Sequence, residues 1–97
     1  MPSETRVRAI EDALERELEA TRVAIVDHSA HHAGHPGAGQ GGGHFELLVV
    51  SVRFEGLGRL ARQRLVYEAL GELMRTEIHA LSMRTLTPDE WQADGGA

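Results

Sequence analysis

The sequence predicts an α+β sandwich, in which helices pack on one face of a small three-stranded mixed sheet. Two long stretches place apolar residues at helical spacing, three short stretches have the character of strands, and a helix-capping motif precedes the end of the chain. With 97 residues the chain is near the commonest domain size, so we expect a single domain over residues 1–97.

The first helix is expected near the N-terminus, where Val7, Ile10, Leu14 and Leu18 recur at spacings of three, four and four. Charged residues fill the positions between them, which is typical of the solvent side of an amphipathic helix. Ser3 is expected to be the N-cap of this helix.

Two strands are expected next. Residues 22–28 ("RVAIVDH") are short and β-branched, and residues 44–54 ("HFELLVVSVRF") carry apolar side chains on both parities. The second pattern predicts a central strand that is covered on both faces. A Gly/His-rich stretch, residues 29–43, joins the two strands and is expected to be a flexible loop. Because consecutive strands usually neighbour one another, we expect this pair to be antiparallel.

The second half of the chain predicts a long helix, a third strand and a short helix. Residues 60–78 keep helical periodicity across Gly71, which we expect to weaken this helix by about 1 kcal/mol without ending it. Residues 79–86 alternate as a strand that returns across the long helix. Residues 87–91 ("TPDEW") form a capping box that opens a last helix, and residues 92–97 are expected to be a frayed tail.

The composition restricts the chemistry. The net charge of -5 comes from 15 acidic residues and 10 arginines, which disfavours a broad nucleic-acid footprint. The chain has no cysteine, so it supplies no disulfide and no thiolate metal ligand of its own. No window approaches 18 apolar residues and no signal peptide is evident, so we expect a soluble, cytoplasmic protein with no membrane association.

Five of the six histidines lie in residues 27–45, and four of them stand at offsets that would share one face of a helix. The glycines and the proline between them make a helix costly there. Three interpretations remain open from the residues alone: a solvated connection, which is favoured, a metal-binding segment, or a pH-responsive loop. The four residues are His28, His31, His32 and His35.

The other candidates have structural explanations as well. His79 stands at the junction of the long helix and the third strand, where a structural hydrogen-bonding role is commoner than metal ligation. Four arginines around the glycine-rich turn at 55–59 imitate a helix-turn-helix, but nearby glutamates favour a solvated face. The four arginines are Arg53, Arg59, Arg62 and Arg64.

The motifs of common hydrolases and nucleotide-binding enzymes are missing from the sequence, so we expect that the protein is not an enzyme.

Several motifs taken together resemble the BolA family, and its BolA1-like branch in particular. They are "VDHSAHHAGH", the "HF" that opens the second strand, the "SVRFEG" turn, "IHAL" and "TPDEW", and the likeness runs from about residue 6 to 91. The resemblance implies an αββααβα fold of the class II KH-like type. It also implies a heterodimer with a monothiol glutaredoxin, in which a [2Fe-2S] cluster is bound by the glutaredoxin cysteine, a glutathione thiolate and BolA histidines.

By position, the resemblance makes His79, in "IHAL", the first expected cluster ligand. The second is His32 from the loop, with His35 as its alternative, and His44 matches a residue with a supporting role. Because imidazole ligands are lost by protonation, the cluster is expected to leave more easily at mildly acid pH. The sequence leaves open the cluster recipient and whether the protein forms a homodimer.

The alternative function is a DNA-binding transcriptional regulator that uses the KH-like surface and the four arginines. The family usually has Arg-His-Arg where this chain has Gln63 between two arginines, which puts the middle histidine's role in that surface in doubt. "EGLG" also fails to match the GXXG loop of KH domains.

Overall fold

The computed structural model describes residues 3–28 and 43–95. Its elements follow the order helix, strand, strand, helix, helix, strand, helix, with one turn of 3-10 helix after the second strand. Their bounds are α1 (Ser3–Leu18), β1 (Arg22–Asp27), β2 (Gly43–Val50), η2 (Val52–Phe54), α2 (Arg59–Leu70), α3 (Leu73–Thr76), β3 (Ile78–Leu86) and α4 (Pro88–Ala93).

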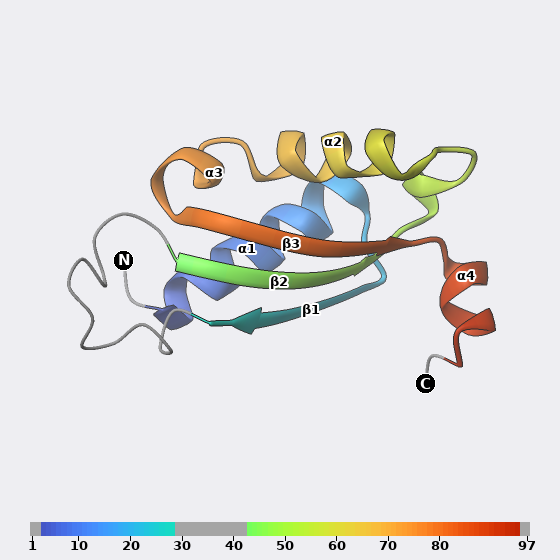
Figure 1. The fold of residues 1–97 in the computed structure, drawn as a ribbon, viewed down its shortest axis with the longest axis horizontal. Coiled ribbons are helices and arrows are strands. Elements are labelled where there is room, and N and C mark those ends of the chain that lie inside the picture. Colours follow the sequence, from blue (N-terminus) through green and yellow to red (C-terminus); the bar gives the residue numbers. More distant parts are fainter. Residues whose placement is uncertain (1–2, 29–42, 96–97) are drawn as a thin grey trace.

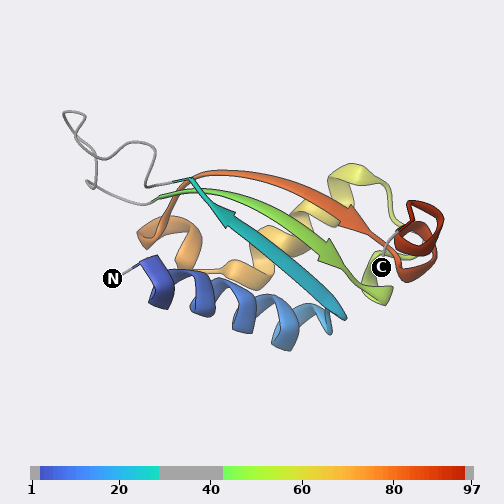
Figure 2. The same cartoon turned by 90° about the horizontal axis from the view of Figure 1, so that it is seen from below.

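The three strands form one mixed sheet in the order β1-β2-β3. β1 pairs antiparallel with β2, and β3 pairs parallel with β2. α1, α2 and α3 all lie against the same face of the sheet, and α4 lies at the end where β3 finishes (Figures 1 and 2). The predicted α+β fold, the central position of the second strand and the antiparallel first pair are therefore confirmed.

The core lies between this sheet and its helices. β2 contributes Phe45, Leu47 and Val49, each at most 2% exposed, and they pack with buried apolar side chains of α1 and α2. The residues between them on β2 are different, because Glu46 is exposed and Leu48 is half-buried. The prediction that both faces of this strand are covered was wrong, since the described helices cover only one face.

The second strand is also shorter than predicted, because Ser51 ends it. The buried Ser51 hydroxyl donates to the Leu18 carbonyl over 2.6 Å and accepts the Arg53 N–H over 2.9 Å. These bonds turn the chain into η2 directly after Val50. The predicted strand over 44–54 is therefore wrong beyond that residue.

Three helix bounds differ from prediction. Gly71 has φ of +51°, a left-handed conformation that suits glycine, and it ends α2 and separates it from α3. The single helix predicted over 60–78 was therefore wrong. α1 begins at Ser3 itself and not after it, and α4 extends to Ala93, inside the tail predicted to be frayed.

The capping box at the start of α4 is confirmed. The Thr87 hydroxyl accepts the Glu90 N–H over 3.1 Å, and the Glu90 carboxylate accepts the Thr87 N–H over 2.8 Å. Within residues 3–28 and 43–95, no helix combines the length and the apolar character that crossing a membrane requires.

The bonds of Ser51 predict a measurable contribution to stability. Ser51→Ala leaves the Leu18 carbonyl buried without its donor, so the free energy of unfolding is expected to fall by about 1–2 kcal/mol. Ser82→Ala, at an exposed position of β3, is the matched control and is expected to change it by less than about 0.5 kcal/mol. Urea unfolding measures both, and equal effects would contradict the structural role of Ser51.

Candidate functional site

Two histidine side chains meet where the parallel strands β2 and β3 begin. Gly43 pairs with Ile78, but the next pair is His44 with Ala80, so the register shifts and His79 is the extra residue. This irregularity places the two imidazole rings in a stack, with centroids 5.4 Å apart and planes 7° from parallel. A bulge of this kind re-aims a side chain, and here it places the His79 ring beside that of His44.

Both rings belong to the face of the sheet that the helices leave uncovered. His44 alternates along β2 with the buried Phe45, which points into the core, so His44 points the other way. His79 is exposed. An imidazole at this position is therefore accessible to a group that approaches from outside.

A third histidine lies at the same end of the sheet. His28 follows β1, and its backbone N–H donates to the backbone carbonyl of His44 over 2.8 Å. Its Nε2 lies 3.5 Å from Oε1 of Glu46, a contact that becomes an ion pair when the ring is protonated. In Figure 1 this is the left-hand end, where β1 finishes and β2 and β3 start. His44 of β2, His79 of β3 and His28, directly after β1, thus lie at one end of the sheet.

The structure brings two of the predicted site residues together and does not describe two others. His79, the expected ligand, contacts His44, the expected supporting residue. His32 and His35 lie within residues 29–42, outside the described part of the chain. Among the described residues, no group of three or more His, Cys, Asp or Glu side chains is arranged to hold a metal ion.

The donor type at this edge fits one side of the cluster that the family resemblance implies. Imidazole nitrogen is a good ligand for iron, and some [2Fe-2S] centres carry histidines on one of their two irons. His79 offers an accessible nitrogen donor for that purpose. The sequence interpretation missed the contact with His44. Both predicted strands begin at these histidines, which places them at one end of the sheet, but the stacking also needs the register shift.

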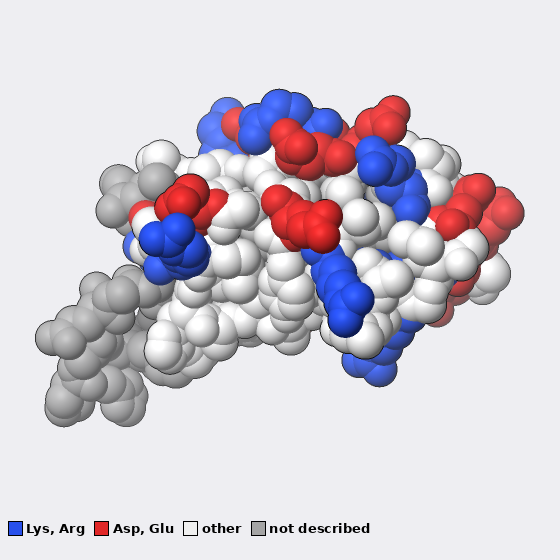
Figure 3. Space-filling view, turned by 90° about the horizontal axis from the view of Figure 1, so that it is seen from above, with Lys and Arg blue, Asp and Glu red and all other residues white. Residues whose placement is uncertain are grey.

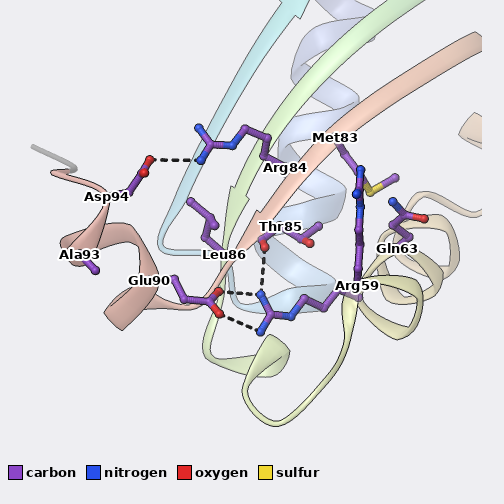
Figure 4. A pocket seen from close by; sticks show the side chains of 10 residues that line it. Arg59, Gln63, Met83, Arg84, Thr85, Leu86, Glu90, Ala93 and Asp94 are labelled. Carbon is purple, nitrogen blue, oxygen red and sulfur yellow. Dashed lines mark hydrogen bonds and ion pairs between the residues drawn. The ribbon is translucent and has the colours of Figure 1, made fainter.

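The opposite end of the sheet is closed by an arginine. Arg62 of α2 donates to the Leu57 and Thr85 carbonyls over 2.8 and 3.0 Å and pairs with both carboxylate oxygens of Glu90 at 2.6 and 3.1 Å. Only 13% of its side chain is exposed. Arg62 lines a hollow of about 630 Å³ between α2, β3 and α4, and Figure 4 shows its partners Thr85 and Glu90 there, with dashed lines for these bonds. Arg62 therefore holds three elements together.

The other predicted arginines are more accessible. Nη1 of Arg53 lies 3.8 Å from a carboxylate oxygen of Glu19, and Arg59 and Arg64 are exposed on α2. Figure 3 shows basic and acidic side chains interspersed over the side of the molecule it presents, without a broad basic area. This pattern is typical of a solvated surface and offers few neighbouring cations to a phosphate backbone.

These features define a small α+β domain with a mixed sheet, one face open and imidazoles gathered at one end. A sequence model of the family described as BolA-like protein matches residues 5–90, and the chain belongs to this family. It is 41% identical over 92 residues to Protein BOLA1, chloroplastic, of Arabidopsis thaliana, and 40% identical over 84 residues to human BolA-like protein 1. These matches cover 90% and 87% of this chain but only 56% and 59% of the two relatives.

Solved structures agree with the fold. A structure described as a bol-like protein from Babesia bovis superimposes with a TM-score of 0.76 at 36% identity, covering 98% of this chain and 95% of that one. A relative from Escherichia coli, 35% identical over 86% of this chain and 76% of its own length, is named a DNA-binding transcriptional regulator. SufE-like protein 1 of Arabidopsis thaliana matches over 89% of this chain and 24% of its own length, at 37% identity. A domain similar to this chain therefore also occurs inside a larger protein.

The Arg62–Glu90 pair predicts a pH dependence of stability. The Arg62 hydrogen bonds, and then the Thr87 N–H, lower the pKa of Glu90 from 4.5 to about 2. A carboxylate with a lowered pKa stabilises the fold above its unfolded pKa, and this contribution is lost as the pH falls through the folded value. Glu90→Gln should therefore unfold at a lower temperature than the wild type at pH 7, with the gap closing between about pH 4.5 and pH 2.

Thermal unfolding followed by circular dichroism at four pH values between 7 and 2 measures this gap. Glu68→Gln, at an exposed position of α2, is the control and should follow the wild type at every pH. A gap for Glu90→Gln that stays constant down to pH 2 would contradict the role of the Arg62–Glu90 pair.

Proposed function

We propose that this chain is a non-enzymatic iron–sulfur partner protein. It binds a monothiol glutaredoxin and shares a [2Fe-2S] cluster with it, in cluster trafficking or iron sensing. The observation that carries the proposal is the exposed His79 imidazole, stacked on His44 at the open edge of the sheet in a chain without cysteine. The glutaredoxin cysteine and a glutathione thiolate supply the sulfur ligands that this chain lacks.

His79 is the first histidine ligand in this proposal, and a loop histidine is the second. His32 holds that role, with His35 as the alternative, since the loop leaves β1 and enters β2 at the edge where His79 lies. His44 supports His79 by stacking on its ring. Histidine ligation of one iron raises the reduction potential relative to an all-thiolate cluster, so a cluster shared in this way suits transfer or sensing. The cytoplasmic location stays a prediction.

The ligand assignment is tested by spectroscopy of the complex. Mixing the wild-type protein with a cluster-loaded monothiol glutaredoxin is expected to change the visible absorption and circular dichroism of the cluster. His79→Ala is expected to abolish that change, and the loop variant, His32→Ala or His35→Ala, that removes the second ligand should alter it. His44→Ala, which removes a supporting contact, should weaken cluster retention by about tenfold.

His28→Ala is the matched control, because it removes an imidazole from the same edge that the proposal does not use as a ligand. Its spectra should follow the wild type. If the wild-type protein leaves the spectra of the glutaredoxin unchanged, the proposed function is wrong. Loss of the signal in His28→Ala and not in His79→Ala would move the ligand to β1.

A DNA-binding regulator is the second candidate, and the exposed arginines Arg59 and Arg64 on α2 are the observation that favours it. With a net charge of -5 and interspersed surface charges, we expect no specific duplex binding at physiological salt. Titration with duplex DNA at 50 and 200 mM salt (about a fourfold range) measures this. Binding that weakens with salt and is lost in Arg64→Ala would promote the DNA-binding function. Arg62→Ala is the poorer probe, because Arg62 supports the fold.

A further inference from the structure

The uncovered face of the sheet carries a shallow hollow of about 380 Å³. It lies beside the histidine edge, the end of the sheet at which His28, His44 and His79 stand. Its floor is formed by side chains of all three strands, and their positions follow from the strand register. Val26, Glu46 and Ser82 stand side by side across the sheet, and Ala24, Leu48 and Arg84 form the next row.

The hollow adjoins the histidine edge directly. His28 and His44 form the row before Val26 and Glu46, two residues away along the strands. Because a strand advances about 3.3 Å per residue, the two rows are about 7 Å apart. A molecule that contacts His79 from the open side therefore lies over the start of this hollow.

We propose that the glutaredoxin partner docks on this open face, over the hollow that Val26 and Leu48 line. The inference rests on the proposed function, because it takes His79 as a ligand of a cluster that the partner also holds. A stable complex buries roughly 800 Å² on each protein, much more than one imidazole presents. The partner must therefore cover surface adjoining His79, and α1, α2 and α3 already occupy the other face of the sheet (Figure 2).

In the described part of the chain, both α3 and the hollow adjoin His79, and their chemistry differs. α3 presents an exposed ion pair between Arg75 and Glu72, with Nη1 and Oε1 3.0 Å apart. The hollow presents apolar surface at Val26, which is 48% exposed, and at the half-buried Leu48, beside Glu46 and Arg84. Interface centres are depleted in charged residues, so the hollow is a better docking surface for the partner than α3.

The hollow holds two charged residues, and each has a neighbour in this chain. Arg84, on β3, is paired with Asp94 over 3.1 Å, and Glu46, on the central strand between Val26 and Ser82, lies 3.5 Å from His28. The contact surface of the partner is expected to be apolar opposite Val26 and Leu48 and polar around them, as is usual for protein interfaces.

The chain offers a matched pair of variants for the test. Val26→Glu places a carboxylate in the hollow, and Val52→Glu places the same charge in η2, beyond the far end of β2 from His44. The two valines are 48% and 49% exposed. Affinity for the cluster-loaded monothiol glutaredoxin is measured by titration calorimetry without oxygen, after circular dichroism has shown that each variant is folded.

We expect Val26→Glu to raise the Kd by about tenfold or more, the effect of burying a charge at the centre of an interface, and Val52→Glu to change it by less than about twofold. Binding of Val26→Glu at the wild-type Kd, or equal weakening in both variants, would overturn the docking face and leave the proposed function standing. A wild-type protein that does not bind the glutaredoxin would overturn the proposed function itself.

Amide chemical shifts of the wild-type protein provide a measurement that needs no variant. Adding the glutaredoxin should broaden or shift the signals of Ala24, Val26, Leu48 and Ser82 and leave those of α2 in place. Perturbation of α2 or α3 without perturbation of these four residues would overturn the docking face.

Discussion

The parallel pairing of β2 with β3 is the constraint on which the rest of the structure depends. Parallel neighbours need a crossover connection, and α2 and α3 supply it on the face that α1 also covers. Since parallel strands begin at the same edge, this crossover also brings His44 and His79 together, and the register shift stacks their rings. The parallel pairing of β2 with β3 therefore determines which face of the sheet the helices cover, which face stays open and where His44 and His79 meet.

The two ends of the sheet use their polar groups in different ways. At the end where β3 finishes, the Arg62 fork binds Glu90 and two carbonyls, and the Arg22 guanidinium lies 5.1 Å from the ring centre of Trp91. These contacts hold α4 in place. At the other end, His79 has its ring exposed and stacked on His44. Paired arginines stabilise the fold at one end, and the His79 imidazole is exposed at the other.

The sequence predicted the fold class and the order of strands because apolar periodicity and capping motifs are local signals. The prediction was wrong wherever a tertiary contact or one backbone angle decided where a helix or strand ends. Ser51 ends β2 through the Leu18 carbonyl, 33 positions away in the chain, and Gly71 ends α2 by adopting a positive φ. The parity pattern of 44–54 predicted two covered faces. This prediction was wrong, because apolar residues such as Leu48 also occur on half-buried surfaces. His79 and His44 were both found from motifs, but their contact depends on a register shift that no local pattern contains.

Under the proposed function, the position of the open face beside His79 has a thermodynamic consequence. The cluster holds the two proteins together through its ligands, and the docking face holds them through burial of apolar surface. Binding free energies of this kind are reciprocal, so contact at Val26 and Leu48 must tighten cluster retention by the same factor by which the cluster tightens docking. A chain that supplies only imidazoles then holds a cluster firmly only while its partner is docked. Under the same proposal, separation of the proteins is expected to leave the cluster on the thiolate side, which is the behaviour that a carrier or a sensor of iron–sulfur clusters requires.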